Sequence, residues 1–184
     1  MDRPLRTARL ELIPATLELT RLAMDDEPGL ARSLGATIPA TWPHDYLDRG
    51  AYEFMLARLA AGPDQVGWWM YFVTHVENPA PRTLIGSAGY KGPPDSEGTV
   101  EIGYGVVSDR RRRGFATEAA LGLIARAFAL GGVRRVLGET LPDLEGSIAV
   151  LERCGFREIG EGSEPGVIRF ELTRQDYEAR GAVR

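Results

Sequence analysis

The stretch Val106-Val107-Ser108-Asp109-Arg110-Arg111-Arg112-Arg113-Gly114-Phe115-Ala116-Thr117 joins a predicted strand to a predicted helix through a basic turn with small residues. Residues 99–107, which lead into it, are rich in β-branched and aromatic side chains, and this favours a strand. After the turn, apolar residues recur at helical spacing, at Ala116, Ala120, Leu123, Ile124, Ala127 and Phe128. The sequence therefore predicts a strand-to-helix junction at the run of arginines.

The start of this predicted helix is suited to holding an anion. Its first amide N–H groups have no acceptor within the helix, and the aligned peptide dipoles place partial positive charge there. Gly114 and Ala116 would let a diphosphate approach the backbone closely, and the arginines at 111–113 add positive charge. The turn thus predicts a site for a phosphorylated ligand, with a solvated arginine run and a nucleic-acid contact as the alternatives.

The composition limits the class of protein. The 184 residues, 43% of them hydrophobic, are enough for one core, and we expect a single domain over residues 1–184. The 22 Lys and Arg residues against 26 Asp and Glu residues give a net charge of −4, which argues against nucleic acid as a partner. No apolar run approaches the roughly 20 residues that cross a bilayer, so we expect a soluble, cytoplasmic protein without membrane contact.

Metal and disulfide chemistry are not expected. Cys154 is the single cysteine, which excludes an internal disulfide and an all-cysteine metal site, and we interpret it as a small hydrophobic residue. His44 and His75 have no partner at metal-ligand spacing. The sequence therefore predicts no metal site.

The hydrophobic pattern alternates between strand and helix periods along the chain. Strands are expected over residues 7–13, 68–76, 83–90, 99–107, 134–140, 156–162 and 167–173. Helices are expected from Leu17 onward and over residues 51–61, 115–130 and 147–154. Residues 30–50, which are aromatic and Pro-rich, are expected to form an irregular loop.

The spacing Arg111-x-x-Gly114-x-Ala116 after a strand resembles the R/Q-x-x-G-x-G/A signature of the GNAT superfamily of acetyl-CoA-dependent N-acetyltransferases. Residues 7–12, 101–104 and 147–156 fall in the order and at the distances that this family shows. The resemblance covers residues 5–177 and is closest to the branch of ribosomal-protein N-terminal acetyltransferases. It implies an α/β (α+β) GNAT fold, a mixed, mostly antiparallel central sheet of about seven strands flanked by about four helices.

The resemblance also implies what the protein binds. Acetyl-CoA would be the co-substrate, and the acceptor a primary amine on a small molecule or at a protein N-terminus. A catalytically silent acetyl-CoA-binding module is the alternative, and a homodimer stays open. The residues that the resemblance assigns to the cofactor are Val106, Val107, Arg111, Arg112, Arg113, Gly114, Phe115, Ala116 and Thr117.

Two catalytic roles fall on the strand before the turn. For the oxyanion, the family uses a backbone N–H where that strand splays, which by position falls at Val107. Gly103 and Gly105 fit a bulge or a close backbone approach there, or simple strand irregularity. Glu101 is the candidate general base, because strand alternation puts it on one face with both glycines; a solvent-facing or paired carboxylate is the alternative.

The general acid is where this sequence departs from the family. Many members place a tyrosine four residues before the Gly-Phe pair, and here that position is Leu151. Ser147 matches a serine of the resembling branch and is the candidate acid, with satisfaction of a helix-start amide as its alternative role. Leu144 stands where an asparagine is usual in the resembling branch, so the resemblance does not carry over one polar contact to the pantetheine arm. The residues expected to line the acceptor pocket or pack in the core are Trp42, Tyr46, Trp68 and Trp69.

Overall fold

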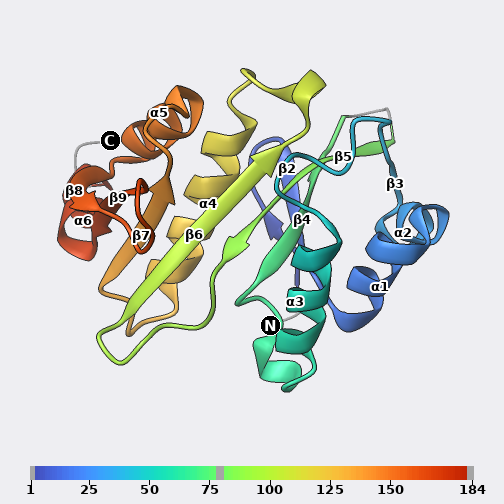
Figure 1. Cartoon of the computed structure of the whole chain (residues 1–184), viewed down its shortest axis with the longest axis horizontal. Coiled ribbons are helices and arrows are strands. Elements are labelled where there is room, and N and C mark those ends of the chain that lie inside the picture. The colour runs from blue at the N-terminus through green and yellow to red at the C-terminus, as the bar shows by residue number, and fades with distance from the viewer. Residues whose placement is uncertain (1–2, 78–80, 182–184) are drawn as a thin grey trace.

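The computed structural model describes residues 3–77 and 81–181, which form one sheet with helices on its faces (Figure 1). Its strands are β1 Leu5–Arg6, β2 Leu10–Pro14, β3 Ala36–Thr37, β4 Met70–His75, β5 Arg82–Tyr90, β6 Thr99–Val106, β7 Arg135–Thr140, β8 Arg157–Glu161 and β9 Ile168–Thr173. Its α-helices are α1 Leu17–Asp25, α2 Glu27–Leu34, α3 Arg49–Leu59, α4 Phe115–Ala129, α5 Glu145–Cys154 and α6 Arg174–Gly181. Short 3₁₀ turns cover Pro63–Gln65 and Ser108–Arg110.

The sheet is mixed and mostly antiparallel, as predicted. Its order is β1-β2-β4-β5-β6-β7-β9-β8, and β3 pairs with β5 off this path. Among the strands of the described residues, only the pairs β6–β7 and β3–β5 are parallel. The predicted class is therefore confirmed, but the described residues hold nine strands and six α-helices, where we expected about seven and about four. The two additional strands, β1 and β3, have only two residues each, too few for a period to be visible in the sequence.

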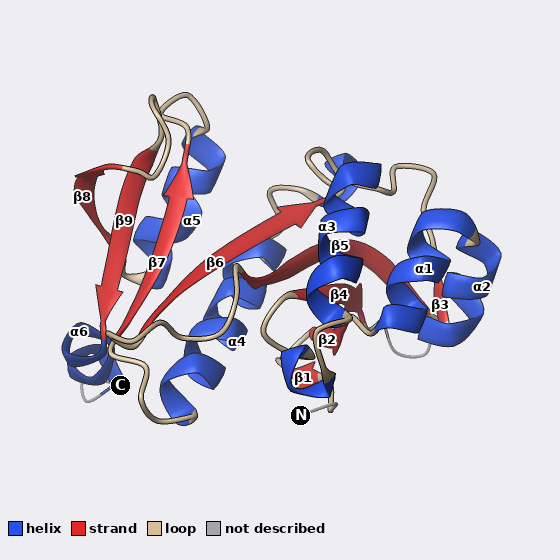
Figure 2. Cartoon of the chain, turned by 60° about the horizontal axis from the view of Figure 1, so that its bottom comes forward, coloured by secondary structure: helices blue, strands red, loops and turns tan. Residues whose placement is uncertain are grey.

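Strand β6 loses one of its two neighbours part of the way along its length. It pairs with β5 from Ile102 to Val106, but its register with β7 ends at Ile102, opposite Gly138. Figure 2 shows β6 and β7 diverging toward their carboxyl ends. The last four residues of β6 therefore leave one row of backbone hydrogen-bonding groups without a strand partner.

Helix α4 follows the arginine turn and covers one face of the sheet, behind β6 in Figure 1. Leu123, Ile124 and Ala127 on this helix are fully buried, and the Tyr90 hydroxyl on β5 donates to the Leu123 carbonyl over 2.6 Å. On β6, Val100 and Ile102 are buried as well. The even-numbered side chains of β6 thus face this core, which leaves the odd-numbered ones on the opposite face.

The expectation of an irregular loop over residues 30–50 is wrong in its first part. Helix α2 runs to Leu34; it begins where Asp26 Oδ1 accepts from the Gly29 amide over 2.9 Å and ends at Gly35, whose φ is 57°. Both caps are visible in the sequence, but only eight residues separate them, and a helix this short shows little periodicity. The irregular segment is residues 38–48, which lies on the same side of the sheet as α3 (Figure 1).

Candidate active site

The turn after β6 ends in a helix start that carries no cap of its own. Gly114 occupies the N-cap position with φ 80°, and no side chain accepts a hydrogen bond from the first turn of α4. Arg112 is also left-handed, with φ 62°. The amides of Phe115, Ala116 and Thr117 therefore lack an acceptor within the helix. Backbone that alternates between right-handed and left-handed conformations, as in this turn, directs successive amides into a concave anion site.

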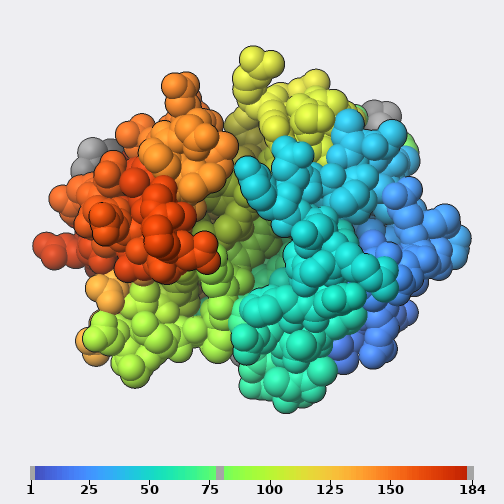
Figure 3. Space-filling model, in the orientation of Figure 1, coloured from blue at the N-terminus to red at the C-terminus, as the bar shows by residue number. Residues whose placement is uncertain are grey.

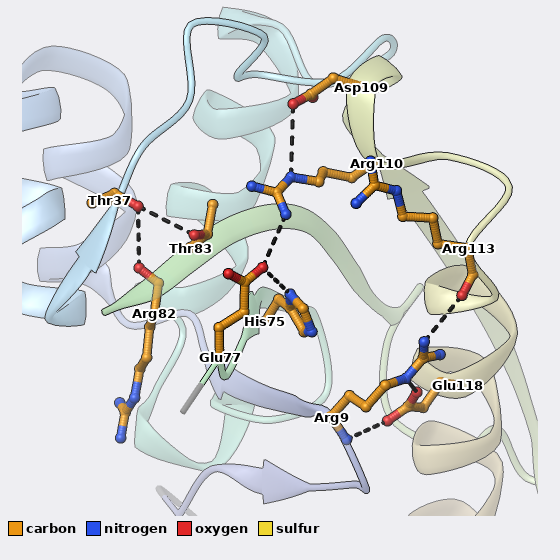
Figure 4. Close-up of polar contacts among 10 residues, drawn as sticks. All are labelled: Arg9, Thr37, His75, Glu77, Arg82, Thr83, Asp109, Arg110, Arg113 and Glu118. Atoms are coloured by element: carbon orange, nitrogen blue, oxygen red, sulfur yellow. Dashed lines mark hydrogen bonds and ion pairs between the residues drawn. The ribbon is translucent and has the colours of Figure 1, made fainter. Parts of the chain in front are cut away.

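The arginine side chains of the turn divide into two that form ion pairs within the protein and two that are exposed. Arg111 pairs with Asp45 over 2.6 Å, and its Nε donates to the Val106 carbonyl over 2.9 Å. Arg110 pairs with Glu77 over 3.1 Å, and Figure 4 shows Glu77 held between Arg110 and His75. Arg112 and Arg113 are exposed. Positive charge available to an anion thus comes from Arg112 and Arg113, while Arg111 ties the turn to residues 38–48.

A second contact holds the turn from the N-terminal side (Figure 4). Glu118, in the first turn of α4, accepts from the Arg9 amide and the Arg9 Nε over 2.7 Å each, and from the Thr7 hydroxyl over 2.6 Å. The same arginine donates to the Arg113 carbonyl over 3.2 Å, and its guanidinium lies 4.6 Å from the centre of the Phe115 ring. Burial raises the pKa of Glu118, but the hydrogen bonds from Thr7 and Arg9 outweigh it, so that its pKa lies below the ordinary value.

The structure corrects one residue predicted to bind the donor. The Val107 amide donates to the Ile85 carbonyl over 2.9 Å, its carbonyl accepts from Arg110, and its side chain is fully buried. Val107 therefore has no group free for a ligand. Since successive residues of a strand direct their backbone groups to opposite edges, the amides of Tyr104 and Val106 point toward the edge that β7 leaves open. Val106 is thus the last residue with an amide at the splay.

The odd-numbered face of β6 borders a hollow in the surface. Figure 3 shows this hollow between the part of the chain around residues 135–175 and the part around residues 40–60. The Glu101 side chain on this face is 19% exposed and pairs with the Lys91 ammonium. A Cβ added at Gly103 would meet nothing within 4 Å. An open slot therefore lies above Gly103, beside Glu101.

Gly105, two residues further on, lies directly beneath His44. A Cβ at this position would come within 2.3–2.7 Å of three atoms of the imidazole ring, so glycine is needed here for a close approach. His44 Nε2 lies 2.7 Å from the Ser87 hydroxyl, and its Nδ1 lies 2.5 Å from the Asp45 carbonyl. Burial lowers the pKa of His44 below its ordinary value of 6.5. No pattern in the sequence indicates this contact, because it joins three segments that are distant along the chain.

The aromatic residues around this site divide between core and surface. Trp42 and Trp69 are buried, at 7% and 8% exposure, and Trp68 is half-buried against the Tyr90 ring. Tyr46, by contrast, is 81% exposed and has φ 69°. Core packing therefore accounts for the two buried tryptophans, while Tyr46 stands at the surface.

Ser147 lies on the other face of β6, against Tyr104. The Tyr104 hydroxyl donates to the Ser147 carbonyl over 3.2 Å and lies 3.4 Å from the Ser147 hydroxyl. Burial raises the pKa of Tyr104 to about 12, so its phenol stays protonated. Leu151, at the family's tyrosine position, is 1% exposed and packs over Gly138, whereas Leu144 is 36% exposed at the N-cap of α5. The one tyrosine hydroxyl beside Ser147 in the described ranges thus comes from β6, which the sequence analysis did not consider.

The fold and the uncapped turn define an acyl-CoA-type transferase site, and comparison with known proteins agrees. The family model described as "Acetyltransferase (GNAT) domain" matches residues 9–157, so the chain belongs to the GNAT acetyltransferase family. The predicted family, enzyme class and acetyl-CoA donor are therefore confirmed.

Individual relatives are distant. An uncharacterized N-acetyltransferase, YjdG of Bacillus subtilis, is 28% identical over 153 residues, which are 83% of this chain and 88% of that protein. FsC-acetyl coenzyme A-N(2)-transacetylase of Aspergillus fumigatus is 28% identical over 94% of this chain and 77% of its own length. The structure of the ribosomal-protein-S5-alanine acetyltransferase from Vibrio fischeri superposes with a TM-score of 0.67 at 17% identity, covering 96% of this chain and 99% of that one. The last likeness is one of fold alone.

Neither a metal-binding cluster nor a membrane-spanning helix is found among the described residues. Within residues 3–77 and 81–181, no group of three or more His, Cys, Asp and Glu side chains is placed to hold a metal ion. Among the helices in these ranges, none is both long and apolar enough to span a membrane.

Proposed function

We propose that the chain transfers an acetyl group from acetyl-CoA to a primary amine by direct attack of the amine on the thioester. The observation that carries this proposal is the uncapped start of α4 beside the unpaired edge of β6. The free amides of residues 112–117 would bind the diphosphate, and the open edge at Tyr104 and Val106 would pair with the pantetheine arm as a strand partner does. Hydrogen bonds to charged groups contribute about 1.5–3 kcal/mol each, so three or four of these amides suffice for micromolar retention of a ligand with other contacts.

The Val106 amide is the proposed oxyanion donor in place of Val107. It is fixed by its strand and aimed at the splay, so it needs no reorganisation when negative charge develops on the thioester oxygen. Removal of one such donor in other enzymes costs about 2.7–4 kcal/mol of transition-state stabilisation. The tie from Arg111 to the Val106 carbonyl keeps this last residue of β6 in place.

Ser147 is the proposed proton donor to the departing thiolate. Its hydroxyl is partly exposed and stands on the core-side face of β6, at the start of α5. Tyr104 donates to the Ser147 carbonyl and so orients the serine residue, while its own high pKa keeps the phenol in the protonated form. This pair supplies the hydroxyl that Leu151 lacks.

Glu101 remains the candidate base from the sequence, acting through a water in the slot above Gly103. The free energy needed to deprotonate the acceptor depends on the type of amine. The pKa of an α-amino group, near 8, lies about one unit above pH 7, and the pKa of a lysine lies more than three units above it. At 1.36 kcal/mol per unit these are about 1.4 and about 4.6 kcal/mol. A site with a weak base therefore suits an α-amine.

A thermal-shift titration followed by a thiol-release assay tests the proposal. Acetyl-CoA should stabilise the protein by about 2.7 kcal/mol at a hundredfold excess over Kd, as linkage requires for a ligand of the native state. Coenzyme A release should then depend on an added amine, tested with N-terminal peptides, polyamines and aminoglycosides. Absence of a shift would contradict the donor site, and a shift without amine-dependent release would favour a silent acetyl-CoA-binding module.

A further inference from the structure

The slot above Gly103 has a second group beside it that accepts protons, the imidazole of His44. Glu101 lies two residues before Gly103 on the same face of β6, and Gly105, beneath the imidazole, lies two residues after it. Residues i and i+2 of a strand are about 6.8 Å apart. An amine above Gly103 therefore lies about this distance along β6 from Glu101 on one side and from the His44 position above Gly105 on the other. The slot is therefore flanked by a carboxylate and by a histidine.

The hydrogen bonds of His44 fix its tautomer. The Asp45 carbonyl has only lone pairs to offer, so the hydrogen of the neutral ring is on Nδ1, which donates to that carbonyl over 2.5 Å. Nε2 is then the acceptor, and the Ser87 hydroxyl donates to it over 2.7 Å. The basic nitrogen thus points at Ser87, which is the cross-strand partner of Gly105 and is 8% exposed.

The surroundings of His44 keep the ring neutral and held in place. Its ring packs edge-on against the buried Trp42, with 6.0 Å between the ring centres. The charged groups that face it are the Asp45 carboxylate, which raises its pKa, and the Arg111 guanidinium, which lowers it; burial is the largest cause, and the net shift is downward. A neutral imidazole at pH 7 is ready to take up a proton.

Glu101 is less available than His44. Its carboxylate pairs with the ammonium of Lys91, the single lysine of the chain. A proton moving to Glu101 would have to break or share that ion pair. At His44 Nε2 no ion pair has to be broken. Its partner is the Ser87 hydroxyl, which can both donate and accept a hydrogen bond.

We propose that His44, in place of the sequence candidate Glu101, takes up the proton that the acceptor ammonium loses, through the hydroxyl of Ser87. The bound ammonium gives an N–H proton to Ser87 Oγ while the hydroxyl passes its own proton to His44 Nε2. The products are a neutral amine, ready to attack the thioester, and an imidazolium whose Nδ1–H still donates to the Asp45 carbonyl; the serine hydroxyl is restored. This inference rests on the proposed function. It also gives Arg111 a role, since its pairing with Asp45 holds the His44 segment against the end of β6.

The test is the pH dependence of kcat/KM for an amine that the wild-type protein acetylates, with variants His44→Gln and Ser87→Ala and the control His75→Gln. His75 is the other histidine and lies near Phe115, at the turn and not at the slot. In the wild type, kcat/KM should fall as the pH drops through a pKa below 6.5, where His44 becomes protonated. In His44→Gln this fall in kcat/KM at low pH, the acid limb of the profile, should disappear. Its kcat/KM at pH 7 should be lower by about 10²-fold or more, the usual contribution of a positioned proton acceptor. Ser87→Ala should be about tenfold slower or more, and His75→Gln should keep the limb.

Thermal shifts with acetyl-CoA show whether the variants fold and bind the donor. Unchanged shifts with the expected rate losses support the relay, and Ser87→Ala serves alone if His44→Gln does not fold. The relay is wrong if both variants keep the wild-type rate and pH limb, or if Glu101→Gln is the variant that removes the limb. If the wild-type protein is stabilised by acetyl-CoA but acetylates no amine, the proposed function itself fails, and the relay fails with it.

Discussion

The two halves of β6 show how one strand serves both stability and chemistry. From Thr99 to Ile102 the strand pairs with β7, and β5 joins on the other side at Ile102. The buried side chains of this half, Val100 and Ile102, face α4. From Gly103 to Val106 it has a neighbour on one side only, and two of its four residues are glycines. The first half contributes to the core, whereas the second half exposes backbone groups and space. Backbone groups without a hydrogen-bond partner cost free energy. The open edge is therefore expected where a bound ligand completes the hydrogen bonding.

The largest expected effect comes from the turn that follows the open half. Gly114→Val places a β-branched residue at φ 80° and covers the amides proposed to bind the diphosphate. We expect about 1–2 kcal/mol of lost stability from the left-handed backbone, and loss of the acetyl-CoA-dependent thermal shift and of transfer. Chemical denaturation and a thermal-shift titration measure the two effects separately.

Gly131→Val is the matched control for this variant. Gly131 follows the other end of α4 with φ 70°, and a Cβ there meets nothing within 4 Å. It should lose a similar amount of stability, about 1–2 kcal/mol, and keep donor binding. Equal donor affinity in the two variants would mean that the turn is not the diphosphate site.

Next in size is the difference between the two glycines of the open half. Gly105→Ala drives a Cβ into the His44 ring, which Ser87 and the Asp45 carbonyl hold in place. Such overpacking costs about 1–3 kcal/mol, and we expect transfer to fall by roughly 10²-fold as the ring is displaced. Gly103→Ala meets open space, so it should fold with a stability within about 0.5 kcal/mol of the wild type.

The kinetics of the two alanine variants distinguish a smaller acceptor space above Gly103 from a displaced His44 ring above Gly105. Gly103→Ala narrows the proposed acceptor slot and should raise KM for the amine while the pH limb stays. Gly105→Ala should lower kcat/KM and alter the pH limb. Identical behaviour of the two variants would remove the distinction between the residue that leaves room for the acceptor and the residue that leaves room for His44.

A smaller effect is expected at the clamp between Arg9 and Glu118. Glu118→Gln keeps the shape but weakens charge-assisted hydrogen bonds from Arg9 and Thr7, which we expect to cost about 1–2 kcal/mol at pH 7 and to raise KM for acetyl-CoA a few-fold. Glu152→Gln, an exposed position on α5, is the control and should change stability by less than about 0.5 kcal/mol.

The pH dependence of this clamp has a definite sign. The pKa of Glu118 is lowered in the folded state, so its contribution is present above the ordinary value of 4.5 and is lost as pH falls through the lower, folded pKa. The difference in unfolding free energy between wild type and Glu118→Gln should therefore shrink at acid pH. Urea unfolding at neutral pH and near pH 3 measures it, and a constant difference would contradict the assignment.

What the sequence alone predicted was local, and what it missed was long-range. The strand, turn and helix over residues 99–130 follow from periodicity, a run of arginines and Gly114, because all the causes lie within one short segment. The face of Glu101 relative to α4 was not readable, since alternation fixes which residues share a face but not which face is covered. The register that ends at Ile102, and with it the shift of the free amide from Val107 to Val106, depends on β5 and β7.

The contacts of His44 illustrate the same limit. The ring reaches Gly105 on β6 and Ser87 on β5 from an irregular segment, and no spacing in the sequence relates the three positions. Asp45 and Arg111 are 66 residues apart in sequence, yet their pairing holds that segment in place. Local structure built from one strand and its turn was thus predictable, whereas contacts that need two distant segments brought together were not.

The smallest expected effect lies at Cys154, on the covered side of the molecule. The thiol is 4% exposed and contacts the Thr117 carbonyl, and burial raises its pKa to about 11. At pH 8 the thiolate is then about one part in a thousand, so a disulfide reagent should label the native protein slowly and the urea-unfolded protein at once. Cys154→Ala should keep acetyl transfer within about twofold and lose about 1 kcal/mol of stability, because only a small apolar contact is removed. Rapid native labelling that abolishes transfer would instead place the thiol in the site.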